Sequence, residues 1–341
     1  MKSLHPLVVI SILSWNNHEA TARCLNSVLA DVYKNRIIVV TDNGSVDLIP
    51  DCIKQQFPDV VFRRNFQNKG FAGGHNGVLT DNIFSEAQYF WILNNDAVVC
   101  PGCLSTLIQT CDNDVTIGLA SPVIRYLSDP EKIEFLAATI DFDNFECPRL
   151  YTSEDVQAVL ANHPQSIWLT GTALLITRRL LVKSPSGFNE QLFAYYEDND
   201  LSVRNIKLGL LNMPVLSASV LHDSPADNSS RAPYYYYLMY RNAWLFWTSH
   251  ISKIEKLRFF FVHLSRSIIL ANQLRQRQPE KSIACLYGTF DAFRGQSGEP
   301  QLNRHLPTWL LNLVLVAPYK KAKFLGAVSV AIKFAMNRIN R

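Results

Sequence analysis

LVVISIL at residues 7–13 and RIIVVTDNGS at residues 36–45 each begin with an apolar run of the length of a strand. Between them, residues 19–29 carry apolar side chains at helical spacing. The second run ends at Asp42-Asn43-Gly44-Ser45, which is a strong turn signal. This order of strand, helix and strand predicts a βαβ unit, and therefore a parallel sheet.

The same alternation continues to about residue 120. The expected elements are helices at 47–57 and after Pro101, strands at 60–62 and 89–93, and a helix opened by the glycine-rich loop at 68–76. Parallel sheets of this kind bind ligands at the carboxyl ends of their strands. Asp42, Asn43 and residues 94–96 fall at such ends, so we expect an α/β fold with a mostly parallel central sheet and a ligand site at one edge.

The composition fits two domains, or one large domain with an appendage. Of the 341 residues, 48% are hydrophobic, so a substantial core is available, and the net charge of +4 is too small to indicate a nucleic-acid partner. After about residue 235 the pattern changes to aromatic-rich helical stretches with basic residues between them. We expect an α/β domain at residues 1–235 and a helical region at residues 236–341.

The end of the chain alternates basic and apolar residues. Its last 22 residues contain no acid and carry Lys320, Lys321, Lys323, Lys333, Arg338 and Arg341. This pattern indicates contact with an anionic membrane surface. Aromatic helical stripes also pack against protein, so a homodimer interface is the alternative. No run reaches the roughly 20 apolar residues of a membrane span.

The seven cysteines are odd in number and irregularly spaced, which favours a reducing compartment. Cys100 and Cys103 have the spacing of a redox or zinc pair, but no second pair follows at zinc-finger spacing. We expect ordinary, partly buried thiols. The opening MKSLHPLVVISILSW shows no secretory signal, because its apolar run is short, so we expect a cytoplasmic protein.

Three carboxylates in four residues, Glu197, Asp198 and Asp200, follow the largely apolar stretch at 193–196. They open a helix expected at 198–208, where the helix dipole favours acids. The dipole accounts for one or two acids but not for the apolar stretch. Apolar surroundings raise the pKa of a carboxyl group, as a general base requires. We therefore favour a functional interpretation of this cluster.

Two other polar groups follow expected strands. Asp96 ends Asn94-Asn95-Asp96 after the strand at 89–93, and His222 follows the strand at 215–221. An exposed carboxylate at a strand end can bind Mg²⁺ or Mn²⁺ together with phosphate oxygens, and histidine is a common metal ligand. A solvated turn and a structural histidine are the alternatives, and these residues alone leave both open.

The two loops after the second and third strands carry possible nucleotide contacts. Asp42 could accept the N3–H of uracil or thymine, or it could form an Asx turn and cap the next helix. The backbone of residues 68–76, with Lys69, could approach a diphosphate, or it could be a structural turn. Its glycine spacing matches neither a Walker loop nor a dinucleotide fingerprint, which argues against a Rossmann oxidoreductase.

The order of these motifs resembles the family 2 inverting glycosyltransferases of the GT-A fold, and among them bacterial rhamnosyltransferases of polysaccharide assembly. The resemblance covers roughly residues 6–245. The residues that carry it are Ser14 to Asn17, Asp42 to Ser45 with Asp47, Asn68 to Asn76, Leu93 to Asp96, Gly171 to Ala173, Gly187 to Glu190, Phe193 to Arg204, His222 and Tyr240 to Asn242. Each motif is weak alone, but their ordered series is specific.

The resemblance implies a GT-A fold, with a Rossmann-like nucleotide-sugar-binding region, and a role for each matching residue. Asp198 would be the catalytic base, and Asp96 and His222 would bind Mg²⁺ or Mn²⁺. Asn94 stands where a full DxD motif has its first acid, which puts direct coordination by that residue in doubt. The residues implied in nucleotide-sugar binding are Ser14, Asn16, Asp42, Asn43, Lys69, Gly70, Asn94, Asn95 and Glu197.

The resemblance also implies an activity and partners. A sugar, in the first instance rhamnose from dTDP-rhamnose, would pass with inversion to a saccharide acceptor, such as one linked to a lipid diphosphate. The product would enter bacterial O-antigen or capsule synthesis, at the cytoplasmic side of the inner membrane. Two alternatives stay open: a galactofuranosyl or hexosyl transferase that uses a UDP-sugar, and a non-catalytic carbohydrate-binding or scaffold subunit.

Overall fold

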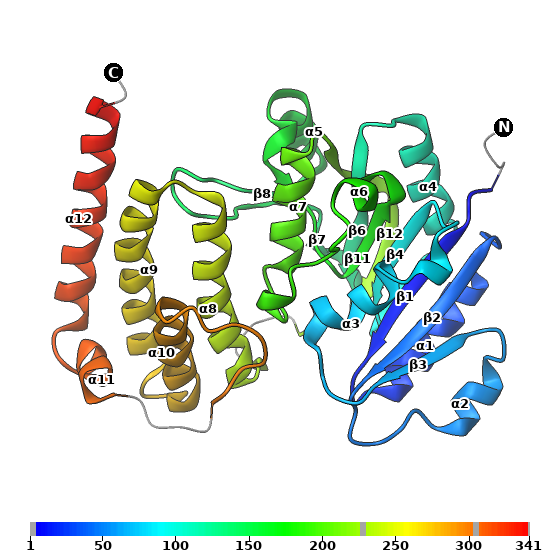
Figure 1. Ribbon diagram of the computed structural model, residues 1–341, viewed down its shortest axis with the longest axis horizontal. Helices are drawn as coiled ribbons and strands as arrows, with labels where there is room; N and C mark the ends of the chain where they lie inside the picture. The colour runs from blue at the N-terminus through cyan, green and yellow to red at the C-terminus, as the bar shows by residue number, and fades with distance from the viewer. Residues whose placement is uncertain (1–4, 226–229, 303–306, 340–341) are drawn as a thin grey trace. The chain divides into compact units, whose positions relative to one another are not determined.

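The computed structural model describes residues 5–225, 230–302 and 307–339, which group into two compact units (Figure 1). The first unit comprises residues up to 193 together with 197–225. The second comprises residues 194–196 and the described residues after 229. The expected division after residue 235 falls inside helix α8 (Pro233–His250).

A central sheet organises the first unit. In the described residues it has nine strands in the order β3-β2-β1-β4-β11-β6-β12-β5, with β7 also paired to β6. The strands are β1 (Val8–Ser14), β2 (Arg36–Asn43), β3 (Val61–Asn65), β4 (Tyr89–Asn94), β5 (Ala97–Val99), β6 (Ile117–Tyr126), β7 (Asp129–Phe135), β11 (Ala173–Thr177) and β12 (Leu211–His222). A second, small sheet has the order β10-β8-β9, from β8 (Ala137–Thr139), β9 (Arg149–Leu150) and β10 (Ile167–Trp168).

The sheet is parallel in its first part and mixed beyond it. β3, β2, β1 and β4 are mutually parallel, as the βαβ pattern predicts. β11 enters between β4 and β6 and runs antiparallel to both. β5 and β7 add further antiparallel pairs. β6 and β12 pair in parallel, and because β11 is antiparallel to both β4 and β6, these two strands run in the same direction as the first four. The expected mostly parallel sheet is therefore confirmed, with β5, β7 and β11 as its antiparallel strands.

Helices cover both faces of the sheet. They are α1 (His18–Ala30), α2 (Asp51–Gln56), α3 (Gly70–Leu79), α4 (Cys103–Asn113), α5 (Ser153–Asn162), α6 (Arg178–Lys183) and α7 (Glu197–Lys207), with short 3₁₀ turns η1 (Asn82–Phe84), η2 (Pro164–Ser166) and η3 (Glu190–Leu192). α2 starts later than the expected residue 47, because Pro50 disfavours a helical backbone at the residue that precedes it.

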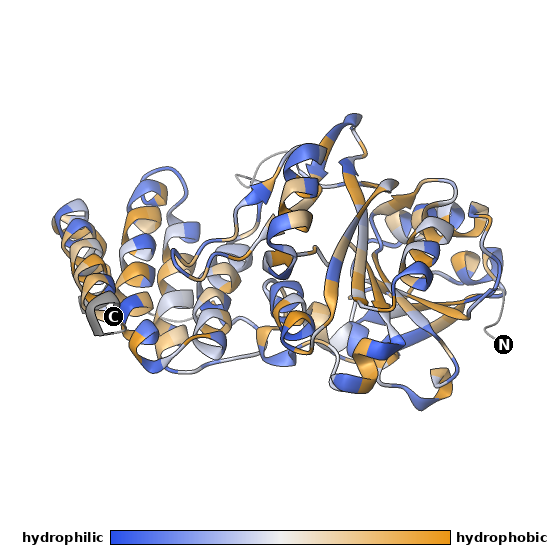
Figure 2. Ribbon diagram, turned by 90° about the horizontal axis from the view of Figure 1, so that it is seen from above, coloured by the Kyte–Doolittle hydropathy of each residue, from blue (hydrophilic) through white to orange (hydrophobic). Residues whose placement is uncertain are grey.

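The apolar runs are buried on both sides because alternate residues of a strand point to opposite faces. Val8, Ile10 and Ile12 join one core cluster with α1 and α4. Val9 joins a second cluster with α3, α6 and α7. The hydropathy colouring in Figure 2 shows these strands as predominantly hydrophobic, whereas the covering helices alternate. The central strands are therefore buried on both faces by the helices.

The second unit is helical. It contains α8, α9 (Lys253–Leu274), α10 (Pro279–Phe293), α11 (Thr308–Leu315) and α12 (Pro318–Ile339). Trp244 stacks on Phe259 and packs edge-on against Phe293, so the aromatic-rich segments form its core. Ser252 and Glu255 form a reciprocal capping box that starts α9. No helix among the described residues is both long and apolar enough to span a membrane.

Candidate active site

The ends of three adjacent strands bring the sequence motifs together. Ser14 pairs with Asp42 across β1 and β2, and Leu13 pairs with Asn94 across β1 and β4. These strands are parallel, so their last residues share one edge of the sheet. The expectation that Asp42, Asn43 and residues 94–96 gather at one edge is met in the backbone.

Asp42 is a braced carboxylate. Its Oδ1 accepts the backbone N–H of Ser45 at 3.0 Å, and Oδ2 accepts from Arg64 at 2.9 Å. The first contact is the Asx turn that the sequence left as an alternative, and it leaves open whether a base also binds there. Sequence reasoning missed Arg64, because a lone arginine on a short strand has no distinguishing pattern.

Ser14 and Asn16 brace the loops beside Asp42. The buried hydroxyl of Ser14 lies 2.8 Å from that of Thr21. Asn16 has a left-handed backbone, with φ of 53°, and its Oδ1 accepts the N–H of Val46. Asn95 donates through Nδ2 to Thr21. These side chains give the loops a defined shape through contacts within the protein.

Asn43 ties β2 to the glycine-rich loop. Its Oδ1 accepts the N–H of Lys69, and its Nδ2 donates to the carbonyl of Gly70. Gly70 has φ of 67°, and an added Cβ would lie 2.3 Å from the carbonyl oxygen of Phe193. The loop therefore requires glycine at residue 70, for its backbone angle and for this close approach.

A cluster of polar side chains surrounds His222 at the end of β12. Its Nε2 lies 3.2 Å from Asp96 Oδ1 and 3.3 Å from Asn94 Nδ2. Its Nδ1 lies 2.9 Å from Glu134 Oε2, on β7. Burial alone would lower the pKa of His222, but the hydrogen bonds and charges of Asp96 and Glu134 outweigh burial and raise it to about 9.

The donors of this cluster fit a divalent cation. Oδ1 of Asp96 is a buried atom that faces Nε2 of His222 at 3.2 Å. A carboxylate oxygen and an imidazole nitrogen thus converge beside the amide of Asn94. No three His, Cys, Asp or Glu side chains of the described residues are arranged to hold a metal ion by themselves. Waters or substrate oxygens would complete the shell.

The acidic cluster opens helix α7 as expected. Asp198 Oδ2 accepts the N–H of Gly171 at 2.9 Å, and Oδ1 accepts that of Asn199. Burial raises the pKa of Asp198 above its ordinary value of 3.8, although these backbone N–H groups oppose the rise. The side chain stays partly accessible, so a substrate proton can reach a carboxylate of raised basicity.

Glu197 differs from its neighbour. It is buried, and its Oε2 has no hydrogen-bond partner among the described residues. Burial, then the charge of Asp198, raises its pKa well above 4.5. Asp200 instead pairs with Arg204 at 2.8 Å, an i,i+4 ion pair that stabilises the helix. Three similar acids thus have three environments.

Short contacts connect Asp198 with the His222 cluster. Gly171 donates to Asp198, and the adjacent Thr172 accepts the backbone N–H of Asn94 through its carbonyl oxygen at 2.9 Å. Asn94 in turn contacts His222. The structure therefore brings Asp96, Asp198 and His222 into one neighbourhood of the first unit, although Asp198 and His222 follow Asp96 by 102 and 126 residues in the sequence.

The backbone just before α7 is strained. Phe193, Tyr195 and Tyr196 have φ of 64°, 69° and 72°, in the left-handed region that non-glycine residues avoid. Each such residue costs about 1–3 kcal/mol, and strain of this kind persists only where surrounding contacts enforce it. Strained residues concentrate at functional sites, which agrees with the position of this segment ahead of Asp198.

Contacts within the helical unit hold residues 194–196 in this conformation. Asn242 Nδ2 donates to the carbonyl oxygens of Ala194 at 2.7 Å and Tyr195 at 2.8 Å. The Tyr195 ring packs edge-on against Tyr235. The Tyr240-Arg241-Asn242 motif therefore acts on the backbone that leads to α7.

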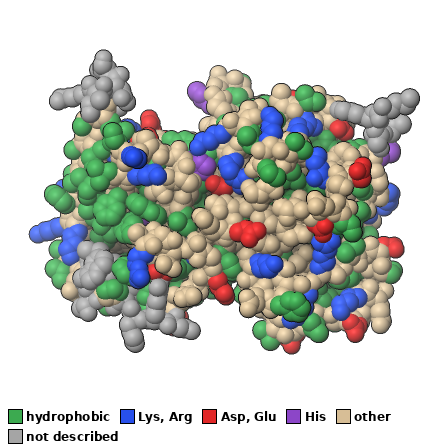
Figure 3. Space-filling view, in the orientation of Figure 1, with side chains coloured by type: hydrophobic (Ala, Val, Ile, Leu, Met, Phe, Trp, Pro, Cys, Tyr) green, Lys and Arg blue, Asp and Glu red, His purple; other side chains and the backbone are tan. Residues whose placement is uncertain are grey.

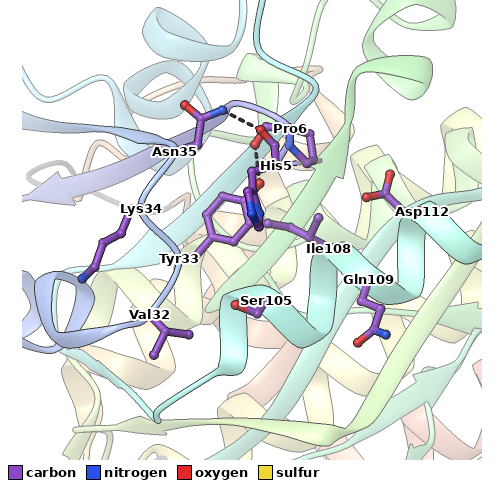
Figure 4. Close-up of a pocket in the computed structure, with 10 residues that line it drawn as sticks. All are labelled: His5, Pro6, Val32, Tyr33, Lys34, Asn35, Ser105, Ile108, Gln109 and Asp112. Atoms are coloured by element: carbon purple, nitrogen blue, oxygen red, sulfur yellow. Dashed lines mark hydrogen bonds between the residues drawn. The ribbon is translucent and has the colours of Figure 1, made fainter. Parts of the chain in front are cut away.

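A hollow of about 630 Å³ lies elsewhere on the first unit, lined by residues that include Tyr33, Asn35, Ile108 and Asp112 (Figure 4). Asn35 precedes β2 directly, so the hollow lies at the amino edge of the sheet, opposite the strand ends described above. It contains none of the predicted site residues.

The seven cysteines include none of the predicted site residues. All seven are free thiols, and Cys103 is buried beside the partly buried Cys100. Burial raises the pKa of the Cys103 thiol, which makes it a poor nucleophile or metal ligand. The expectation of ordinary thiols agrees with this environment.

Comparison with known proteins identifies the fold and the family. Residues 9–162 match the model of glycosyl transferase family 2. This part of the chain is a family 2 glycosyltransferase domain. The match begins in β1 and includes Asp42 and Asp96 at the strand ends. The enzyme is a hexosyltransferase.

A relative of this glycosyltransferase occurs in two strains of Mycobacterium tuberculosis, CDC 1551 / Oshkosh and ATCC 25618 / H37Rv. It is an N-acetylglucosaminyl-diphospho-decaprenol L-rhamnosyltransferase, 27% identical over 222 residues, which cover 58% of this chain and 69% of the relative. The name of this relative agrees with the expected resemblance to rhamnosyltransferases.

Three solved structures have a similar fold. The mannosyltransferase PcManGT of Pyrobaculum calidifontis, in complex with GDP-Man and Mn²⁺, has a TM-score of 0.51 at 14% identity, over 98% of this chain and 87% of that one. GalNAc-T7 with UDP, GalNAc and Mn²⁺ has a TM-score of 0.55 at 14% identity, over 86% and 56%. S. aureus TarS 1-349 has 0.51 at 14%, over 96% and 91%. The expected GT-A fold is confirmed.

Proposed function

We propose that this glycosyltransferase moves rhamnose from dTDP-rhamnose to a saccharide acceptor carried on a lipid diphosphate, with inversion. The name of the M. tuberculosis relative supports both the rhamnosyl donor and the lipid-linked acceptor. The observation that carries the proposal is the hydrogen-bonded connection from Asp198, through Gly171 and Thr172, to Asn94 and its cluster.

Asp198 acts as the general base in this proposal. The two N–H groups that it accepts orient its carboxylate, and burial raises its basicity. It removes the proton from the acceptor hydroxyl, whose oxygen then attacks the anomeric carbon from the face opposite the diphosphate. One displacement inverts the anomeric centre, so no enzyme nucleophile is required.

The donor lies at the strand ends. Asp96 and His222 would hold Mg²⁺ or Mn²⁺, which when bound stabilises the negative charge of the leaving diphosphate. Ser14, Asn16, Asp42 and Asn43 shape the base and ribose region. Further donor contacts are assigned to Lys69, Gly70, Asn94, Asn95 and Glu197.

The test is nucleoside diphosphate release with a panel of donors, offered with N-acetylglucosaminyl-diphospho-lipid and analysed by mass spectrometry of the product. We expect rhamnose transfer from dTDP-rhamnose and loss of about 10²–10⁴-fold in kcat for Asp198→Asn, with donor binding retained. Asp59→Asn, an exposed acid before β3, is the matched control. Near-normal turnover by Asp198→Asn would refute the base assignment.

The donor panel also separates the alternatives. Transfer from a UDP-sugar in preference to dTDP-rhamnose would indicate a galactofuranosyl or other hexosyl transferase on the same fold. Absence of nucleotide release with every donor would indicate a carbohydrate-binding or scaffold role instead.

The helical unit supports membrane association of the enzyme. On α12, exposed positions recur every three or four residues and include Phe324, Val330 and Phe334, which are 68%, 53% and 67% exposed. Lys320 and Lys323 lie on the same exposed face, and α12 contains no acid. Figure 3 shows hydrophobic side chains with neighbouring Lys and Arg over these helices. Such a face suits an anionic bilayer surface. Arg338 also belongs to the predicted basic tail, and Arg341 lies outside the described residues.

Flotation with anionic and neutral vesicles tests this surface. We expect the full chain to float with anionic vesicles and Phe324→Ser/Phe334→Ser to remain in solution. Val46→Ser, at a position that is 87% exposed in the first unit, is the control. If the double variant floats normally but loses a dimer seen by sedimentation, the face is a homodimer interface. Flotation of the full chain, but not of the double variant, with anionic vesicles would support the proposed role at the cytoplasmic side of the inner membrane, in O-antigen or capsule synthesis.

A further inference from the structure

Glu134 is a charged residue of the His222 cluster that the sequence did not single out. It lies on β7, and its side chain is 16% exposed. Its Oε2 is 2.9 Å from His222 Nδ1, whereas Asp96 and Asn94 contact the other ring nitrogen. The two sides of the imidazole therefore face different partners.

The backbone of β7 is built to aim this side chain. Ile124 of β6 pairs with Phe135, and the next residue, Arg125, pairs with Ile133. Glu134 is thus the extra residue of a β-bulge. β7 and β12 lie on opposite sides of β6, so Glu134 must reach past β6 to meet His222. Bulges re-aim side chains in this way and are frequent beside active sites.

The chemistry of histidine gives this contact a purpose. A cation can bind Nε2 only through its lone pair, so the proton of the neutral ring must then be on Nδ1. Glu134 is the acceptor that faces Nδ1. Carboxylates in this position fix the ring orientation and raise the basicity of a ligating histidine. Asn94 Nδ2, which faces Nε2, is compatible with an unprotonated Nε2.

We propose that Glu134 is a positioning residue, which holds His222 with its Nε2 lone pair directed to the cation site beside Asp96. Glu134 contacts the far side of the ring and so is not itself a ligand. This inference depends on the proposed metal dependence of the enzyme.

Mn²⁺ binding to the full chain tests the inference without measuring activity. Free Mn²⁺ is followed by electron paramagnetic resonance, with and without dTDP, and thermal melting verifies that each variant is folded. We expect Glu134→Ala to weaken Mn²⁺ binding by about 10–100-fold. Glu134→Gln should retain much of the affinity, because its side-chain oxygen can still accept the Nδ1–H. Glu131→Gln, at an exposed position of the same strand, should bind as wild type.

The outcomes separate this inference from the proposed function. If Glu134→Ala binds Mn²⁺ as tightly as wild type while Asp96→Ala and His222→Ala do not, Glu134 has no positioning role and the metal site stands. If Glu134→Gln fails as badly as Glu134→Ala, the carboxylate charge matters rather than the orientation, and the proposal is also wrong. If wild type does not bind Mn²⁺ under either condition, both the metal dependence and this inference fall.

Discussion

The two units of this glycosyltransferase place buried carboxylates in different surroundings. In the helical unit, Tyr237 donates to Asp291 at 2.6 Å, and the buried Arg241 donates to Asn242. In the first unit, Glu197 Oε2 is buried without a hydrogen bond in the described structure. A buried polar atom without a partner is costly, so Glu197 is held beside Asp198 at a cost in stability, whereas Asp291 Oδ2 links α10 to α8 within the helical unit.

The surfaces of the two units differ as well. Phe324 and Phe334 project from α12 of the helical unit, and Lys320 and Lys323 accompany them. The first unit has exposed apolar residues too, such as Val46, but it carries the strand-end cluster and Asp198. In the proposed function, chemistry belongs to the first unit and attachment to the helical unit, and each prediction below tests one side of that division.

The largest effect expected on the first unit comes from Gly70→Ala. An added Cβ would clash with the Phe193 carbonyl in a backbone of φ 67°, so we expect a loss of about 2–4 kcal/mol in unfolding free energy, together with loss of activity. Denaturant unfolding measures it. Gly77→Ala, in the same helix with nothing within 4 Å, should be neutral or stabilise by about 0.5–1 kcal/mol. Equal effects of the two would contradict the close approach.

Asn242→Ala should act on the helical unit. It leaves the carbonyl oxygens of Ala194 and Tyr195 without this donor, and we expect a cost of about 1–3 kcal/mol. Because the strained residues lead directly to Asp198, kcat should fall while donor binding changes little. An unchanged kcat in a destabilised variant would show that this motif supports only the helical unit.

The pH dependence of kcat should report the environment of Asp198. A general base works in its deprotonated form, so activity is lost as the pH falls through its pKa. Burial raises that pKa, and the acidic limb should therefore lie above the ordinary 3.8 of an aspartate. An acidic limb at or below 3.8 would mean that the carboxylate is not desolvated during turnover.

Glu197 should affect stability in a pH-dependent manner. Its folded pKa is raised, so the unfolded chain releases this proton first as the pH rises above about 4.5, and the folded state loses stability from there up to the raised pKa. Glu197→Gln removes that loss. We expect a higher melting temperature than wild type at pH 7 and a smaller difference at pH 4. A variant that melts lower at both values would show that Glu197 is structurally required as an acid.

The smallest effect on chemistry is expected from Phe324→Ser/Phe334→Ser. These side chains lie far along the sequence from the strand ends, so kcat with a water-soluble acceptor should stay within about 2-fold of wild type. Activity with acceptor embedded in anionic vesicles should fall more. Equal losses in both assays would mean that α12 serves the fold rather than attachment.

Much of the fold was predictable because its signals are local. The apolar runs at 7–13 and 36–40 are strands, the acids at 197–200 open a helix, and the residues after each strand lie at one edge. The mostly parallel sheet followed from the βαβ pattern, but nothing in residues 173–177 indicates that this strand enters antiparallel between β4 and β6.

The sequence by itself determined the alternation of elements, the sheet edge where the polar motifs gather and the resemblance to the family, since periodicity, turn residues and motif order are properties of short segments. Only the tertiary structure decided which polar groups meet. Glu134 and His222 are 88 residues apart, and Arg64 reaches Asp42 from another strand. Such contacts depend on strand order, register and a bulge, which arise when distant segments pack together, and no local pattern encodes them.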